Sequence, residues 1–175
     1  MFTCCIGSPD NRHGDKTIMN WKYLRQVPWL DTRAKFVAAT PQKGSLLDLG
    51  SSDGKTLCHF AELRPDLNYF AADIADYSRN YPAGCQFQRI NLEEEKLRWP
   101  DASMDSITCS HLVEHLKNLD TLVGEISRLL KPGGRVYFET PHPKTLALPS
   151  LSGPAADTFT MNFYDDHTRA NCPDQ

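Results

Sequence analysis

The sequence predicts an α/β fold with a doubly wound, mostly parallel sheet of the Rossmann-like kind. From about residue 44 to residue 140, short apolar segments typical of strands alternate with segments whose apolar residues recur at helical spacing. The segment 46–54 (LLDLGSSDG) also has the pattern of a buried strand that ends in a tight turn before a helix. Glycine permits the positive φ angles and the close backbone approach that such a turn needs. Together, these observations predict parallel strands joined by right-handed crossovers.

The elements can be placed in chain order. A short helix is expected after Asp31, a suitable N-cap, and should stop before Pro41. Strands are expected at 45–49, 68–72, 84–90, 106–109 and 135–139, helices at 55–64 and 117–130, and a weak helix or turn at 75–82. The helix at 117–130 is the clearest, because its apolar residues recur at spacings of three and four. The segment Pro132-Gly133-Gly134 should end it.

The chain is expected to divide into three parts. Residues 1–30 form an N-terminal arm or cap, residues 31–141 the Rossmann-like domain, and residues 142–175 an irregular tail rich in Pro, Ser and Gly. The aromatic-rich stretch from Trp21 to Leu30 either caps a ligand site or packs on the outside of the sheet.

Composition argues against several classes of function. The chain has 175 residues, 40% of them hydrophobic, which suffices for one domain with its own core. A net charge of −3 gives no basic footprint, so no nucleic-acid partner is expected. No apolar run approaches the roughly 20 residues of a membrane span, and the N-terminus lacks the pattern of a secretory signal. The six cysteines include no C-x-x-C pair and fit reduced thiols, so a cytoplasmic location is expected.

Asp73 is a candidate ribose ligand. It ends the second predicted strand, 19 residues after Gly54, where an acidic residue of a doubly wound fold can accept hydrogen bonds from both ribose hydroxyls. The alternative is that Asp73 caps the turn that follows it. Ser52 occupies the place of the glycine that admits a pyrophosphate in G-x-G-x-x-G, and a phosphate-binding G-x-x-x-x-G-K-[ST] is missing. The turn therefore suits an adenosine without phosphates.

Four motifs in this order resemble those of the class I S-adenosylmethionine-dependent methyltransferases: DLGSSDG at 48–54, Asp73, SHLVEHL at 110–116 and LLKPGG at 129–134. The similarity runs from about residue 44 to residue 141. It implies S-adenosylmethionine as cofactor and an in-line transfer of its methyl group to a nucleophile. The resemblance also implies a set of cofactor contacts. These are Asp48, Gly50 and Ser51 at the methionine portion, Asp73 at the ribose, Ile74 against the adenine, Asn91 and Leu92 near the adenine edge, and Cys109 and Ser110 beside the cofactor.

His111 is the candidate catalytic residue, as a base for an acceptor that must lose a proton. With Glu114 and His115 it also fits the H-x-x-E-H pattern of a zinc-hydrolase family. Two histidines four residues apart on a helix could chelate zinc, but this stretch follows a strand directly and offers no clear third ligand, so no metal is expected. His142 and His167 are further candidates for acceptor contacts.

The pattern departs from the family after the fifth strand. Only 35 residues follow Thr140, and they lack the final helix and antiparallel strand pair of class I methyltransferases. The sequence therefore predicts a sheet without these elements and a chain that either is truncated or is naturally short. Strand five would be an edge, covered by the tail, by a partner or by a second copy in a homodimer.

The leading hypothesis is a cytoplasmic S-adenosylmethionine-dependent methyltransferase that acts on a small-molecule, lipid or protein acceptor. The alternative is a non-catalytic S-adenosylmethionine-binding fragment or partner subunit, because the C-terminal elements are missing. A nicotinamide-dependent oxidoreductase is a third reading, which the glycine spacing disfavours.

Overall fold

The computed structural model describes residues 32–149. The N-terminal arm, Asp31 with its expected capping role, and the tail residue His167 lie outside the described residues.

Within residues 32–149, five strands form one sheet in the order β3-β2-β1-β4-β5, and every neighbouring pair is parallel. The strands are β1 (Ser45–Leu49), β2 (Asn68–Asp73), β3 (Gln86–Arg89), β4 (Met104–Ser110) and β5 (Leu130–Glu139). The strand order reverses between β1 and β4. In open α/β sheets a ligand binds at such a reversal, beyond the carboxyl ends of the strands. The predicted fold class is confirmed.

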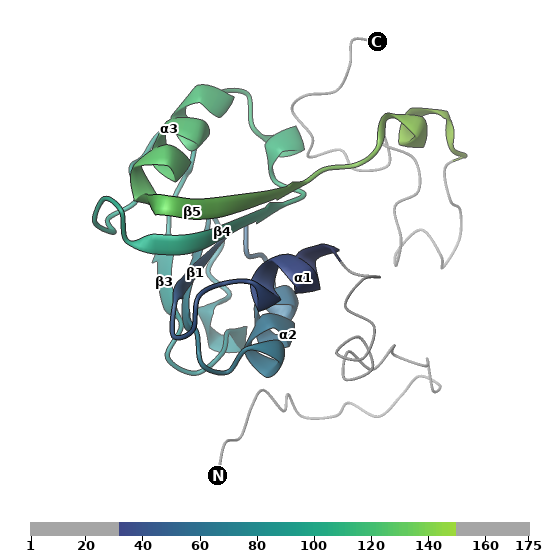
Figure 1. The fold of residues 1–175 in the computed structure, drawn as a ribbon. Helices are drawn as coiled ribbons and strands as arrows, with labels where there is room; N and C mark the ends of the chain where they lie inside the picture. The colour runs from purple at the N-terminus through teal and green to yellow at the C-terminus, as the bar shows by residue number, and fades with distance from the viewer. Residues whose placement is uncertain (1–31, 150–175) are drawn as a thin grey trace, which may run out of the picture.

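Helices cover both faces of the sheet (Figure 1). On one face, α1 (Thr32–Ala38) and α2 (Lys55–Leu63) share a buried cluster with the sheet residues Leu46, Tyr69 and Ala71. On the other face, α3 (Leu119–Leu129) shares a cluster with Leu47 and Leu49. Successive residues of β1 therefore point to opposite layers, as a strand buried on both faces requires.

The boundaries of α3 have local causes. Asn118 is extended and its side chain accepts a hydrogen bond from the backbone N–H of Asp120, so the helix begins two residues later than the sequence predicts. Near its end, the Arg128 guanidinium pairs with Glu125 and Asp101 at 2.7 Å each. The same side chain donates to the carbonyls of Leu97 and Trp99, which anchors the helix to the preceding loop.

The structure differs from the sequence prediction around the segment 132–134. Strand β5 begins at Leu130 and runs through Pro132-Gly133-Gly134, which was expected to be a turn before the strand. The register jumps from the pair Met104–Leu130 to the pair Ser106–Arg135, so the extra residues form an irregularity inside the strand pairing. Gly133, with φ of 80°, supplies the left-handed conformation that this irregularity uses.

Short 3-10 turns replace or add to the expected elements. The weak helix expected at 75–82 is limited to η2 (Ser78–Asn80), and η3 (Val113–His115) follows β4. A further turn, η4 (Pro143–Ala147), lies where no element was expected; the His142 side chain caps it by accepting from the N–H of Lys144. Across the described residues, no helix is both long and apolar enough to cross a membrane.

Candidate active site

The glycine turn after β1 is tightly packed on both sides. Gly50, Ser52 and Gly54 all have positive φ angles, of 72°, 45° and 79°. A Cβ added to Gly54 would lie 2.3 Å from Cδ1 of Tyr81, and one added to Gly50 would lie 3.2 Å from the Leu112 side chain. Only glycine fits at Gly54, because its surroundings and its backbone angle both exclude a side chain.

Tyr81, which lies outside the segment 48–54, holds this turn in place by hydrogen bonds. Its hydroxyl donates to the carbonyl of Ser52 at 3.0 Å and lies 2.8 Å from the hydroxyl of the buried Ser51. Burial raises the pKa of Tyr81 to about 12, so the phenol stays a donor at neutral pH. The phenol thus holds the strained Ser52 in place, with the ring of Phe87 packed edge-on against the Tyr81 ring.

Asp73, at the end of β2, is joined to the glycine turn. One carboxylate oxygen accepts from the N–H of Ser52 at 2.8 Å and the other from the N–H of Ala75 at 2.9 Å. The turn-capping role that the sequence left as an alternative is therefore present. A carboxylate has about four acceptor sites, so this role does not use up the capacity of Asp73.

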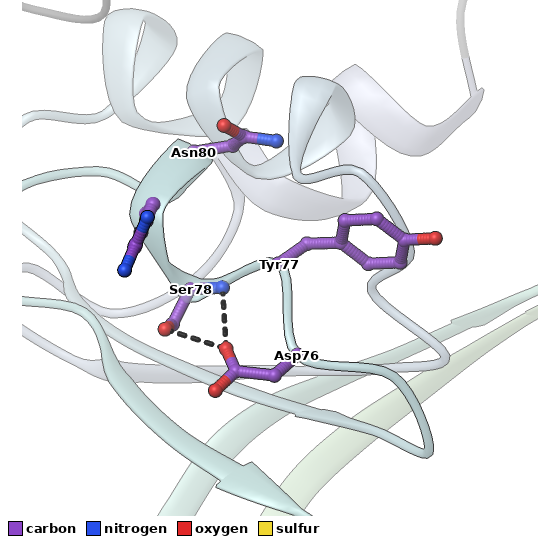
Figure 2. A pocket seen from close by; sticks show the side chains of 5 residues that line it. Asp76, Tyr77, Ser78 and Asn80 are labelled. Atoms are coloured by element: carbon purple, nitrogen blue, oxygen red, sulfur yellow. Dashed lines mark hydrogen bonds between the residues drawn. The ribbon is translucent and has the colours of Figure 1, made fainter.

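The loop after Asp73 is exposed and forms a small pocket. Ile74 has 65% of its surface exposed and Tyr77 has 45%. The pocket is lined by residues Asp76–Asn80, and Figure 2 shows the Tyr77 ring extending away from the turn that Asp76 closes by accepting from Ser78. The main-chain oxygen of Asn80 also lies beside Gly54. The pocket is therefore next to the glycine turn.

Asp48 is a buried carboxyl group beneath the same edge. Burial raises its pKa from 3.8 to about 7, while a hydrogen bond from the Thr108 hydroxyl at 2.6 Å and the charge of Arg33 act in the opposite direction. Asp48 therefore ionises less readily than an exposed carboxyl group, and a cation placed beside it would favour its charged form.

The carboxyl end of β4 contributes one apolar and one polar contact. Cys109 is fully buried, and burial raises its pKa to about 12, so it is a neutral thiol rather than a nucleophile. The hydroxyl oxygen of Ser110 is buried and has no hydrogen-bond partner within the part of the chain that the structure describes. Such a group is a natural contact for a bound polar ligand.

The strand register brings the predicted residues to one edge. Leu49 pairs with Ala72 of β2 and with Cys109 of β4, so the next residues of each strand, Gly50, Asp73 and Ser110, emerge side by side. The side chains of Asn91 and Leu92 already have contacts within the protein. The Asn91 side chain accepts from the N–H of Glu93, and Leu92 is packed in the core on the α3 face.

His111 lies just past β4 between two carboxylates. Its Nδ1 is 3.4 Å from Glu114 and its Nε2 is 3.4 Å from Glu139, while 52% of its side chain is exposed. Glu139 also pairs with Arg33 at 3.1 Å and accepts from the hydroxyl of Tyr137. The residue is therefore accessible from solvent and surrounded by groups of both charges.

The segment that matches the zinc pattern is not a helix. Residues 113–115 make a single 3-10 turn and His111 has a positive φ of 53°, so the two histidines are not one helical turn apart on a common face. In the described part of the chain, no three His, Cys, Asp or Glu side chains are grouped as a metal site.

Four residues of this edge were not assigned a role from the sequence: Arg33, Tyr81, Glu114 and Glu139. Glu114 lies in the same motif as His111, three residues further on, and this spacing could have suggested their contact. The other three residues contact partners that are distant in the sequence, so no local pattern predicts these contacts.

The residues present fit an adenosine-type cofactor. Within residues 32–149, Ser110 offers a buried hydroxyl without a hydrogen-bond partner, and Asp73 keeps acceptor capacity at the end of β2.

Comparison with known proteins agrees with this arrangement. A family model described as a methyltransferase domain matches residues 21–171. The malonyl-[acyl-carrier protein] O-methyltransferase of Methylococcus capsulatus is 30% identical over 129 residues, covering 69% of this chain and 46% of the relative. The ubiquinone biosynthesis O-methyltransferase of Paraburkholderia phytofirmans is 29% identical over 121 residues, covering 66% and 50%. The chain thus spans about half the length of these curated relatives.

A solved structure shows the same fold. The S-adenosylmethionine-dependent methyltransferase from Mesorhizobium loti superposes with a TM-score of 0.55 at 23% identity, covering 73% of this chain and 57% of the other.

Proposed function

Because the chain belongs to the S-adenosylmethionine-dependent methyltransferase family, we propose that it binds S-adenosylmethionine at the carboxyl edge of its sheet and transfers the methyl group to an acceptor. The acceptor is a small molecule, a lipid or a protein, and not a nucleic acid. The observation that carries the proposal is the register that brings Gly50, Asp73 and Ser110 together at the reversal of strand order.

Each predicted residue has a proposed role at this edge. Bound S-adenosylmethionine supplies a methyl group activated by a positively charged sulfur. Around it, Asp48, Gly50 and Ser51 hold the methionine portion, Asp73 holds the ribose, Ile74 lies against the adenine, Asn91 and Leu92 approach its edge, and Cys109 and Ser110 lie beside the cofactor. The near-neutral pKa of Asp48 supports its role, since a buried carboxyl group of this kind can ionise when a cation binds.

His111 is proposed as the catalytic base. Its half-exposed imidazole stands at the end of β4, where a proton from the acceptor can reach it. An acceptor that is already ionised would need no base, and His111 would then only line the acceptor site.

Calorimetric titration tests the cofactor directly. We expect S-adenosylmethionine and S-adenosylhomocysteine to bind and NAD not to bind. Binding of NAD alone would reject the proposal.

Asp73→Asn tests the ribose contact. The substitution keeps one oxygen acceptor and removes the charge, so the affinity for S-adenosylhomocysteine should fall about 10- to 100-fold, the value of a hydrogen bond to a charged group. Asp120→Asn is the control, because this residue is exposed on α3, which packs on the opposite face of the sheet from α2. An unchanged affinity in Asp73→Asn would leave Asp73 with its turn-capping role alone.

The second candidate function is a non-catalytic cofactor-binding subunit. It is supported by the outer edge of β5, which pairs with no strand among residues 32–149. Tight cofactor binding without methyl transfer to any acceptor would favour it. In either case we propose that a second copy or another partner covers the β5 edge, in a reducing cytoplasm that keeps Cys109 a thiol.

A further inference from the structure

Glu114 is a buried carboxyl group with an unusual lack of partners. Only 3% of its side chain is exposed, and neither carboxylate oxygen has a hydrogen-bond donor among the described residues. A buried carboxylate is normally paired or hydrogen-bonded, because removing it from water is costly otherwise. The group that approaches it is the imidazole of His111, whose Nδ1 is 3.4 Å from Oε1.

The two carboxylates beside His111 differ in what else they bind. Glu139 is partly exposed, pairs with Arg33 and accepts from Tyr137, so its charge is already offset. Among residues 32–149, Glu114 has no such ion pair with an arginine and accepts no hydrogen bond. An N–H on Nδ1 of His111 is therefore the donor that Glu114 can accept from, and this fixes which ring nitrogen carries the proton in the neutral imidazole.

We propose that Glu114 is a positioning residue that holds His111 with Nδ1 protonated, so that Nε2 removes a proton from an acceptor hydroxyl group. The inference rests on the proposed function. The acceptor oxygen forms a bond to the methyl carbon as the carbon–sulfur bond breaks, and that electron pair stays on sulfur, which becomes neutral. The hydroxyl proton moves to Nε2, and the imidazolium is then stabilised between Glu114 and Glu139. Contacts of 3.4 Å are long for hydrogen bonds, and catalytic contacts of this kind tighten when a substrate binds.

The same geometry selects the class of acceptor. A carboxylate is ionised at neutral pH, needs no base, and would meet two negative side chains. A phenol or an alcohol keeps its proton at neutral pH and gains from a base held in place. In the part of the chain that the structure describes, the charged groups that face His111 are Glu114 from η3 and Glu139 from β5, with Arg33 of α1 behind Glu139. The inferred acceptor class is therefore a hydroxyl compound.

Nitrogen NMR of histidine-labelled protein tests the orientation without any acceptor. The His111 signals are assigned by comparison with His111→Gln, under conditions where the imidazole is neutral. We expect the Nδ1-protonated form to dominate in the wild type and in the control Glu94→Gln, an exposed carboxylate of the loop after β3. Glu114→Gln should lose this preference. If the Nε2-protonated form dominates in the wild type while S-adenosylhomocysteine still binds, the inference is wrong and the proposed function stands.

Methyl transfer to catechol and to benzoate tests the acceptor class. We expect transfer to catechol only, with kcat reduced about 10- to 100-fold in Glu114→Gln and KM nearly unchanged, because Glu114 acts through His111. Transfer to benzoate only would overturn the inference. Cofactor binding without transfer to either compound would overturn it together with the enzymatic part of the proposed function, and absence of cofactor binding would reject the proposed function itself.

Discussion

The two halves of the carboxyl edge differ in how their polar groups are satisfied. In the half formed by β1 and β2, the phenol of Tyr81 reaches Ser51 and Ser52, and Asp73 accepts from two backbone N–H groups. In the half formed by β4 and β5, the Ser110 hydroxyl and both oxygens of Glu114 are buried without hydrogen bonds in the described part of the chain. In the first half, these polar groups are therefore hydrogen-bonded to other groups of the protein itself.

This difference has an energetic consequence. The strained angles of the glycine turn persist because packing and hydrogen bonds surround them, so substitutions there should destabilise the fold. The unsatisfied groups beside β4 instead carry a cost that a ligand or a partner would relieve. Substitutions there should damage function while leaving the fold as stable or making it more stable.

Gly54→Ala should give the largest effect, and Gly84→Ala is its matched control. The two glycines have nearly the same φ angle, 79° and 81°, so both substitutions carry the same backbone strain of about 1–2 kcal/mol. A Cβ at Gly54 meets the Tyr81 ring at 2.3 Å, whereas one at Gly84 has no atom within 4 Å. Displacing a buried ring adds about 1–3 kcal/mol. Urea unfolding should therefore show Gly54→Ala losing clearly more stability than Gly84→Ala; equal losses would mean that the turn is not tightly packed.

Asp48→Asn should reveal the cost of a buried carboxylate through its dependence on pH. The pKa in the fold is about 7 and the ordinary value is 3.8, so the folded state binds the proton more tightly. The wild type therefore loses stability as pH rises from about 4 to about 7, and the variant does not. Relative to wild type, the variant should gain about 2–3 kcal/mol in free energy of unfolding between pH 5 and pH 8. A gain independent of pH would contradict the raised pKa, and weaker cofactor binding is expected together with the gain.

The sequence could predict the fold class and the glycine turn with Asp73 because both depend on local patterns. The run 45–49, the glycines after it and Asp73 lie within thirty residues of one another. The exact start of α3 was missed by two residues, since the extended Asn118 decides it. The early start of β5 was missed because pairing with Met104 holds Leu130 in the sheet, and such pairing is not a local property.

The second half of the edge was harder to predict for the same reason. The contact between Arg33 and Glu139 joins α1 to β5, which lie more than 100 residues apart in the sequence. In the first half, Tyr81 was missed for the same reason, because it reaches Ser51 from another loop. His111 was singled out by its motif, but its carboxylate neighbours come from η3 and β5 together. The cofactor contacts assigned to single residues stay predictions until a ligand is bound.

Glu114→Leu should stabilise the fold by about 1–2 kcal/mol, because an apolar residue of similar size replaces a buried and incompletely satisfied charge. His111 remains exposed and needs no buried partner in the variant. Thermal unfolding measures the gain, and Glu94→Leu at an exposed position should change stability by less than about 0.5 kcal/mol. A clear loss of stability in Glu114→Leu would show that the two halves do not differ as described.

Tyr81→Phe should give the smallest change in stability and still separate the two halves. Removing the hydroxyl leaves the buried Ser51 oxygen and the Ser52 carbonyl without this partner, which costs about 1 kcal/mol. Tyr69→Phe is the matched control, because its hydroxyl bonds two carbonyls at the far end of α2, those of Phe60 and Arg64. Both variants should lose similar stability in urea. Since Ser52 is strained and adjoins Asp73, the affinity for S-adenosylhomocysteine should fall severalfold in Tyr81→Phe alone. An equal loss of affinity in Tyr69→Phe would mean that the affinity falls because the whole fold is less stable. The proposed role of Tyr81 in holding Ser52 in place would then be rejected.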